Sequence, residues 1–266
     1  MTALRITPLM SIGGQRWLRM IERNLLVYKH GWLVLLSGFF EPLFYLLSIG
    51  FGLGRLVGDV NGPGGEPIPY ALFVAPALLA ASAMNGAITE STFNFFFKLN
   101  YDKTFASILT TPMSPADISI GELAWALIRG ALYTLGFIAV MLVMGLVRSP
   151  LIVLTLPGAL LIGFAFAAIG MAATSFMRTW QDFDLIQLFI LPMFLFSGTF
   201  FPLDNFPPLA QTLIQLTPLY HGVALLRGLS VGVVGPETVV HIGYLSVLGL
   251  VGMAVVSRRL DRLLLK

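Results

Sequence analysis

The sequence predicts an all-α polytopic membrane protein, organised as a single transmembrane domain over residues 1–266. Of its residues, 57% are hydrophobic and only 11% are charged, whereas soluble domains carry about 25% charged residues. The mean hydropathy is +0.87, and the apolar residues gather in runs long enough to cross a bilayer. An aqueous fold of this length has no room to bury so much apolar surface, so most of it must face lipid.

Six apolar stretches are long enough for membrane spans, because crossing the hydrocarbon core takes about 20 residues of helix. They divide the chain into a cytoplasmic N-terminal segment (residues 1–31), a six-span bundle (residues 32–257) and a cytoplasmic tail (residues 258–266). The N-terminus does not resemble a cleavable signal peptide, since the first long apolar run begins only near Trp32. The predicted spans are Trp32–Gly54, Tyr70–Glu90, Gly121–Val147, Leu151–Met177, Leu185–Phe201 and Val239–Ser257.

The distribution of Lys and Arg predicts that both termini are cytoplasmic, because short cytoplasmic segments of membrane proteins are enriched in these residues. With that orientation the inside segments hold twelve of them and the outside segments hold Arg55, Arg148 and Arg227, with Arg129 inside a span. The net charge of +3 therefore reflects topology, and no nucleic-acid partner is expected.

The segment before the first span is predicted to form an interfacial amphipathic helix. Helical projection of residues 17–28 places an apolar face opposite Arg16, Arg19 and Arg23, which is typical of a helix lying on the membrane surface. A basic flank that only sets the topology is the alternative. The apolar face comprises Trp17, Met20, Ile21, Leu25 and Tyr28.

Two connections between spans have unusual compositions. Residues 92–120 form the longest cytoplasmic loop, and the spacing of Lys98 and Asp102 favours a short helix that ends before Pro112. Residues 202–238 are too apolar for a solvated loop and contain four helix-breaking prolines between Pro202 and Pro218. They predict a re-entrant or interfacial helical hairpin at the outer mouth. Residues 61–65, by contrast, predict an exposed turn.

The sequence lacks the residue patterns of catalytic sites. No Gly-Lys pair is present for a nucleotide-binding loop, and the chain has no cysteine. His30, His221 and His241 are isolated in the sequence, without metal-ligand spacing. We therefore predict no enzymatic activity, no catalytic residue, no metal site and no cofactor in this chain.

Charged residues inside spans are costly and usually paired. Glu41 lies nine residues into the first span and Arg129 eight residues into the third, so both lie roughly 12–14 Å from the inner face. We predict an intramembrane ion pair between Glu41 and Arg129. The alternative is that Glu41 is solvated by a cavity and Arg129 extends to the interface.

Five segments, distributed along most of the chain, carry a recognisable pattern. The main one runs from Ile190 to Pro207 (ILPMFLFSGTFFPLDNFP) and continues at Leu216–His221 (LTPLYH). The others are Glu41–Leu47 (EPLFYLL), Gly121–Trp125 (GELAW) and Phe105–Ser114 (FASILTTPMS). In sequence and in order these segments resemble the permeases of type-2 ABC exporters, and they are most similar to those of nodulation lipo-oligosaccharide and daunorubicin-resistance exporters.

The resemblance implies a subunit in the cytoplasmic membrane of a bacterium that pairs with a second permease, identical or paralogous, and with two separate ATPase subunits that carry ATP and magnesium. It implies export of a lipid-linked saccharide, a lipid or a hydrophobic drug through an interface lined by spans two and five, with membrane lipid around the complex. The expected ATPase-coupling residues are Arg16, Arg19, Arg23, Lys98, Asp102, Lys103, Phe105 and Leu109. The expected cavity residues are Asn85, Thr89, Met193, Phe196 and Thr199.

Two other functions stay open at this point. An ion-coupled secondary transporter would carry inverted repeats with broken helices, and none is visible between the two halves of the chain. A membrane-embedded transferase would need acidic or histidine clusters at one face. Asp182 and Asp184 are the one close acidic pair, and a solvated cytoplasmic turn explains them better.

Overall fold

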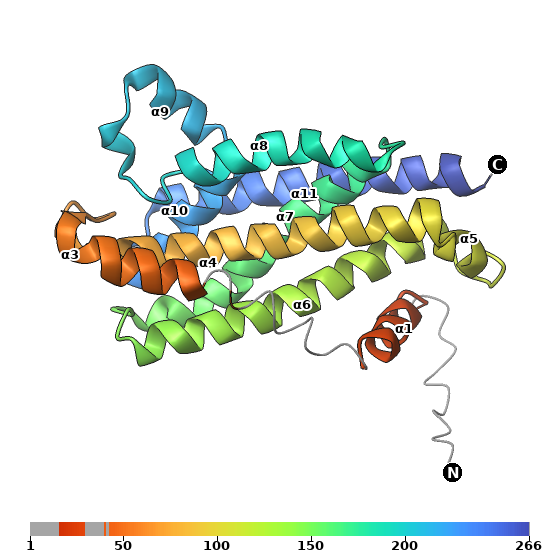
Figure 1. The fold of residues 1–266 in the computed structure, drawn as a ribbon, viewed down its shortest axis with the longest axis horizontal. Coiled ribbons are helices and arrows are strands. Elements are labelled where there is room, and N and C mark those ends of the chain that lie inside the picture. Colours follow the sequence, from red (N-terminus) through yellow and green to blue (C-terminus); the bar gives the residue numbers. More distant parts are fainter. Residues whose placement is uncertain (1–15, 30–39, 41–42, 266) are drawn as a thin grey trace, which may run out of the picture.

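The structure is a computed structural model that describes residues 16–29, 40 and 43–265. In that part of the chain it is a bundle of long helices that run roughly along one axis (Figure 1). The four longest helical runs are Tyr70–Tyr101, Pro115–Val143 (α6), Pro150–Thr174 and Pro236–Leu264 (α11), and each is long and apolar enough to cross a membrane. The fold is therefore that of a polytopic helical membrane protein.

The bundle has two distinct ends (Figure 1). At one end lie α1 (Leu18–Tyr28), α5 (Thr104–Ile108) and the C-terminal end of α11. We call it the α5 end. At the other end lie α3 (Gly54–Val57), α9 (Pro208–Gln215) and the start of α10 (Pro218–Val231), and we call it the α9 end.

Four of the six predicted spans coincide with the four long helical runs, although each run begins or ends several residues away from the predicted boundary. The second run illustrates why. It joins α4 (Tyr70–Thr89), the π-helical turn η2 (Glu90–Asn94) and a second π-helical turn η3 (Phe97–Tyr101). The helix thus continues about ten residues beyond the predicted end at Glu90, because charged and polar residues stop the hydropathy signal without stopping the backbone hydrogen bonds.

The short helix predicted around Lys98 and Asp102 ends before Pro112 as expected, but the structure divides it between two elements. Lys98 belongs to η3, where the Asp102 N–H donates to the Phe97 carbonyl five residues back (2.9 Å). Lys103 then takes a left-handed conformation (φ 52°) and separates η3 from α5. The residues of this segment that were predicted to be helical therefore belong to two elements, the end of the second run and the short helix α5.

For the other two predicted spans, the described residues do not form a helix long enough to cross a membrane. Of the first one, Trp32–Gly54, residues 32–39, 41 and 42 lie outside the described residues, and its described part continues through η1 (Leu46–Leu53) into α3. For the fifth, Leu185–Phe201, the structure has α8 (Phe183–Phe196), a helix of 14 residues. It ends where Gly198 adopts φ +71°, and at 1.5 Å per residue it spans roughly 21 Å, less than the ~30 Å hydrocarbon core.

The remaining elements connect these helices. A two-stranded antiparallel hairpin of β1 (Asp59–Asn61) and β2 (Pro67–Pro69) encloses the predicted turn, with Val60 opposite Ile68, so the all-α prediction missed a small strand pair. Three short 3₁₀ turns are η4 (Pro150–Leu154), η5 (Trp180–Asp182) and η6 (Leu203–Asn205), and η4 leads directly into α7 (Thr155–Thr174).

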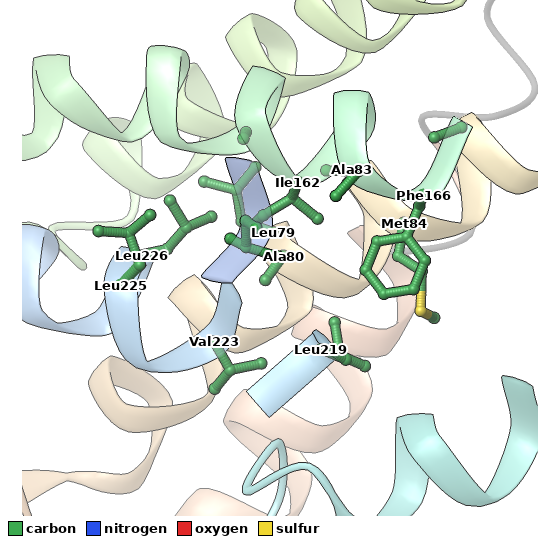
Figure 2. Close-up of a cluster of buried hydrophobic side chains, with 14 of the residues drawn as sticks. Leu79, Ala80, Ala83, Met84, Ile162, Phe166, Leu219, Val223, Leu225 and Leu226 are labelled. Carbon is green, nitrogen blue, oxygen red and sulfur yellow. The ribbon is translucent and has the colours of Figure 1, made fainter. Parts of the chain in front are cut away.

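The core lies between α4, α7 and α10. Most residues of α4 and α7 are buried, as expected for helices that are apolar on every side. Figure 2 shows side chains of these three helices meeting in one cluster, including Leu79, Ala80, Ala83, Met84, Ile162, Phe166, Leu219, Val223, Leu225 and Leu226. Because α10 takes part in this core, the predicted outer hairpin is half embedded: α9 is mostly exposed, and α10 is packed.

Close packing of α7 against α11 depends on small residues. A Cβ added to Gly252 would lie 2.8 Å from the backbone carbon of Ala168. Gly249 similarly accommodates the ring of Phe164, which lies within 2.2 Å of the position of an added Cβ. In a membrane, small residues at helix interfaces permit the close approach that dispersion forces require.

Candidate functional site

A cluster of charged and aromatic side chains lies between α1, the second helical run and α6. We call it the polar cluster. Its centre is the carboxylate of Glu90, which is 3% exposed and stands at the first residue of the π-helical turn η2. The members are Tyr28 from α1, Glu90, Asn94 and Lys98 from the second run, and Glu122, Arg129 and Tyr133 from α6.

Arg129 is held on several sides within this cluster. Its guanidinium forms a close ion pair with Glu90 through Nη1. It also donates to the Tyr28 hydroxyl (3.2 Å) and to the Tyr133 hydroxyl (3.0 Å). The guanidinium carbon lies 5.1 Å from the centre of the Tyr28 ring, within the range of a cation–π contact. Tyr28 thereby connects α1 to the middle of α6.

Lys98 completes the charge balance. Its Nζ lies 2.6 Å from Glu122 Oε2 and 3.9 Å from Glu90 Oε1. Two cations thus face two carboxylates, and all four side chains are at least largely buried. Removing one partner from such a group leaves a buried charge uncompensated, which is far costlier than losing a surface pair.

The predicted Glu41–Arg129 pair stays a prediction, because Glu41 lies outside the described residues. The structure instead gives Arg129 a partner in Glu90, the last residue of the predicted second span. The signal that identifies Glu90 is helical spacing: Glu90, Asn94 and Lys98 recur every four residues and therefore share one helix face.

The predicted coupling residues form two groups. Arg16, Arg19, Asp102 and Lys103 are exposed at the α5 end. Lys98 lies in the polar cluster, Phe105 is fully buried with its ring 5.0 Å from that of Phe95, and Leu109 packs against the core. The eighth residue, Arg23, is half-buried and donates to the side chain of Asn24 (3.1 Å).

Helix α1 and the loop after α5 are connected directly. The Arg16 guanidinium donates to the Pro112 carbonyl. Deeper in the interface, Met20 packs onto Gly121 of α6, where an added Cβ would lie 2.4 Å from the Cβ of Met20. The predicted apolar face of α1 is correct for Met20 and Tyr28. Leu25, however, is exposed together with Leu26 and Val27, because α6 contacts the side of α1 that carries Met20 and Asn24.

An apolar cavity of about 890 Å³ extends along α8. Its walls come from η2 and the end of α4, from the second half of α7, and from α9. Met193 and Phe196, both predicted as cavity residues, line it. The other three predicted residues do not line it: Asn85 is half-buried, Thr89 is exposed, and Thr199 is fully buried.

A second cavity, of about 660 Å³, opens at the α9 end and has polar walls. Its lining includes Asp204, Tyr220, Glu237 and His241. Arg227 also lines it and is buried. The Arg227 guanidinium donates to the carbonyls of Phe73 (3.0 Å) and Gly198 (2.7 Å), so it joins α4 to the turn that ends α8.

The interpretation of all histidines as isolated is wrong for two of them. The Nδ1 atoms of His221 and His241 lie 2.8 Å apart, and the His221 ring stacks on Tyr244 with 3.9 Å between ring centres. Sequence spacing misses this pair because α10 and α11 bring together residues twenty positions apart. In the described part of the chain, no group of three or more His, Cys, Asp or Glu side chains is arranged to hold a metal ion.

Asp182 has a structural role at the turn before α8. Its carboxylate accepts hydrogen bonds from the backbone N–H groups of Arg178 (2.8 Å) and Thr179 (3.1 Å). These bonds hold the pKa of Asp182 below its usual range. The residue therefore caps a turn, as the solvated-turn interpretation of Asp182 and Asp184 predicted.

A helical membrane bundle with a large apolar cavity, a polar cavity near one end and a buried charge cluster defines a membrane transport subunit. Comparison with known proteins identifies its family: residues 15–230 match the model of the ABC-2 type transporter. The chain belongs to the ABC-2 type transporter family and is a bacterial, multi-pass membrane permease of an ABC exporter.

Its relatives agree with this assignment. The chain is 33% identical to Nodulation protein J of Rhizobium leguminosarum bv. viciae over 256 residues, which cover 94% of this chain and 97% of the relative. It is 34% identical to Nodulation protein J of Sinorhizobium fredii strain NGR234, with 87% of each chain covered. It is also 28% identical to the inner membrane transport permease YadH of Escherichia coli, with 69% of this chain and 70% of that one covered.

Proposed function

We propose that this chain moves an amphiphilic molecule, in particular a lipid-linked saccharide, across the cytoplasmic membrane, using ATP hydrolysed by a separate ATPase subunit. Lipids and hydrophobic drugs are the other cargoes of this class. One observation carries the proposal: an almost wholly apolar cavity extends along α8, and a polar cavity opens at the α9 end. An apolar chain and a polar headgroup need this pair of environments.

The segment between α8 and α10 brings the two cavities close together. Phe206 lines the apolar cavity, and Asp204, two residues away, lines the polar one. The mostly exposed apolar face of α8, including Leu188 and Phe189, is the surface on which a second permease copy or a paralogue would complete the route. This segment would close the route on the outer side.

The α5 end is the cytoplasmic end in this proposal. Among the described residues it carries most of the Lys and Arg side chains, including those at Arg258, Arg259 and Arg262, which favours the inside. Both termini would then be cytoplasmic in the inner membrane. The ATPase would contact the exposed residues Arg16, Arg19, Asp102 and Lys103.

In this mechanism the buried members of the coupling group transmit the movement. A displacement of α5 would be transmitted to the core through the contact between Phe105 and Phe95. A displacement of α1 would be transmitted to α6 through Met20, which packs on Gly121. Because packed interfaces shift between discrete arrangements and do not deform continuously, ATP-driven closure of the ATPases would switch the bundle between inward-open and outward-open states. ATP and magnesium stay on the ATPase, and this chain binds no cofactor.

The test is to purify the chain together with its partner ATPase and to reconstitute the complex in liposomes with a fluorescent lipid-linked saccharide. We expect vanadate-sensitive ATP hydrolysis and ATP-dependent movement of the label between leaflets. The variant Phe196→Ala removes part of the apolar cavity wall and should lower transport by up to about tenfold. Phe196 is half-exposed, so it loses about half of the ~1.5–3 kcal/mol that a fully buried side chain contributes.

The matched control is Leu56→Ala, which removes apolar surface from an 83% exposed side chain that lines neither cavity and should leave transport unchanged. The proposal fails if the chain alone moves the label with only an ion gradient, because that result defines an ion-coupled secondary transporter. It also fails if the complex hydrolyses ATP without moving any amphiphile.

A further inference from the structure

A third cavity, of about 260 Å³, lies between α1 and the second helical run at the α5 end. It is far larger than the ~10–15 Å³ that admits one water and far smaller than the two transport cavities. The cavity is lined by side chains of α1, of the second run and of the residue that follows this run. They are Arg23, Asn24, Val27 and Tyr28 from α1, Phe93, Asn94, Phe97 and Lys98 from the second run, and Asp102 directly after it. The space fits a small polar group and is too small for a whole amphiphile.

Two side chains that line this space, Asn24 and Tyr28, have a hydrogen-bond donor without an acceptor among the described residues. Asn24 is 1% exposed, and its Nδ2 has no hydrogen-bond partner among the described residues. The Tyr28 oxygen accepts from Asn94 (3.4 Å) and Arg129 (3.2 Å), which leaves its own O–H with no acceptor in the described part of the chain. Because unpaired buried donors are costly, such a cavity favours a ligand made of acceptors.

Two charged side chains that line the cavity, the guanidinium of Arg23 and the carboxylate of Asp102, have no oppositely charged partner among the described residues. Arg23 forms no ion pair with a described residue and donates only one N–H, to Asn24. Lys98 is already neutralised by Glu122 (2.6 Å). Asp102 is exposed and has no cationic partner among the described residues. An acceptor-rich anionic group therefore suits Arg23, and a cationic donor suits Asp102.

The surroundings of the cavity are apolar. Val27 is 60% exposed and Phe93 is 48% exposed, and both line the opening. Leu25 and Leu26 continue this exposed surface along α1. A soluble phosphate ester has no apolar group to bury against this surface. The acyl chains of a lipid do cover it, and each Å² of apolar surface that they remove from water stabilises binding by about 25 cal/mol.

We propose that this cavity binds the headgroup of a phosphatidylethanolamine molecule, with its phosphate at Arg23, Asn24 and Tyr28 and its ammonium at Asp102. The bound lipid fills the space between α1 and the second run, directly beside the polar cluster. Arg23 and Asp102 then serve lipid binding, which leaves Arg16, Arg19 and Lys103 as the surface for the ATPase. The site is separate from the two transport cavities.

The experiment is native mass spectrometry of the purified full-length chain, titrated with phosphatidylethanolamine, phosphatidylcholine and phosphatidylglycerol of identical acyl chains. We expect phosphatidylethanolamine to bind most tightly. The Arg23→Gln variant should weaken all three lipids about tenfold, since a charge-assisted hydrogen bond is lost. Asp102→Asn should weaken phosphatidylethanolamine the most, because its ammonium donates N–H bonds directly to the carboxylate, whereas the methyl groups of choline hold its charge farther away.

The matched controls are Arg19→Gln, which removes an exposed guanidinium paired with Glu22 (2.6 Å), and Lys103→Gln, which removes an exposed charge next to Asp102. Both should bind lipid as the unaltered chain does. The proposal is overturned if phosphatidylcholine binds as tightly as phosphatidylethanolamine, or if Arg23→Gln and Arg19→Gln behave alike. Displacement of the lipid by equimolar glycerophosphoethanolamine, which has no acyl chains, would also overturn it.

Discussion

Glu90 is the residue on which the buried charges depend. It contacts the guanidinium of Arg129 and lies 3.9 Å from Lys98, so one carboxylate serves two cations from two helices. Its position at the start of a π-helical turn is consistent with the frequent occurrence of such turns at functional sites. The cluster joins α1, the second run and α6, and in the proposed mechanism movements of the α5 end would pass through it.

Replacing Glu90 should destabilise the protein strongly. In Glu90→Gln the guanidinium of Arg129 loses its counter-charge while staying buried, and breaking a buried pair costs about 3–5 kcal/mol. Thermal unfolding in detergent, compared at equal protein concentration, measures the loss. Glu22→Gln is the control, because the Arg19–Glu22 pair is exposed and surface pairs contribute about 0–1 kcal/mol. Equal melting temperatures for the two variants would contradict the prediction.

The same measurement decides whether Glu41 also interacts with Arg129. Two double-mutant cycles, one for Glu90 with Arg129 and one for Glu41 with Arg129, report the coupling of each pair. We expect coupling in the Glu90 cycle because the contact is direct. Additive effects in the Glu41 cycle would remove Glu41 from the cluster, whereas coupling would establish it as a further partner.

At the scale of elements, the α1–α6 contact depends on one glycine. Gly121 has no side chain, so Met20 lies where a Cβ would be, and the Trp17 carbonyl is 3.1 Å from the same point. The hydrophobic pattern of α1 identified its packed residues Met20 and Tyr28, but the position of the contact on α6 follows from the missing side chain.

The variant Gly121→Ala should push α1 away from α6. Overpacking an interface typically costs about 1–3 kcal/mol, and here it also separates Tyr28 from Arg129. We expect less ATPase to co-purify with the variant and a lower unfolding temperature. Gly130→Ala is the matched control in the same helix, since no atom lies within 4 Å of its added Cβ, and alanine favours helix by up to about 1 kcal/mol. If both variants retain the ATPase equally, α1 does not depend on this contact.

At the scale of the molecule, the arrangement assigns opposite sides of the membrane to the two ends of the bundle. The β1–β2 turn is at the α9 end and Lys103 is at the α5 end. If the charge distribution sets the topology as proposed, these positions lie outside and inside the cell respectively.

Single cysteines test this topology cleanly, because the chain has no cysteine of its own. Gly64→Cys, in the exposed turn, should react with a membrane-impermeant maleimide in intact spheroplasts. Lys103→Cys should react only after the membrane is opened. Labelling of Lys103→Cys in intact spheroplasts, with Gly64→Cys protected, would mean that the protein is inserted the other way round.

The sequence by itself determined the class of the protein, four of its spans, the existence of an amphipathic segment before the first span, and its resemblance to the type-2 ABC exporter permeases. These features are local, since hydropathy, charge counts and short motifs are read along the chain without knowing which helices touch. The sequence also predicted that Arg129 is a buried charge that needs a partner. Of the five residues predicted for a substrate cavity, Met193 and Phe196 line the apolar cavity and the other three do not.

Only the tertiary structure decided which residues meet. Glu90 with Arg129, His221 with His241, and Arg227 with the carbonyls of Phe73 and Gly198 are contacts between elements far apart in the chain. Likewise α10 proved to be a core helix and α8 a short one, because burial depends on the neighbours that a helix finds and a left-handed glycine can end a helix inside an apolar run. Partners in a bundle are set by packing in three dimensions, and no one-dimensional periodicity encodes that choice.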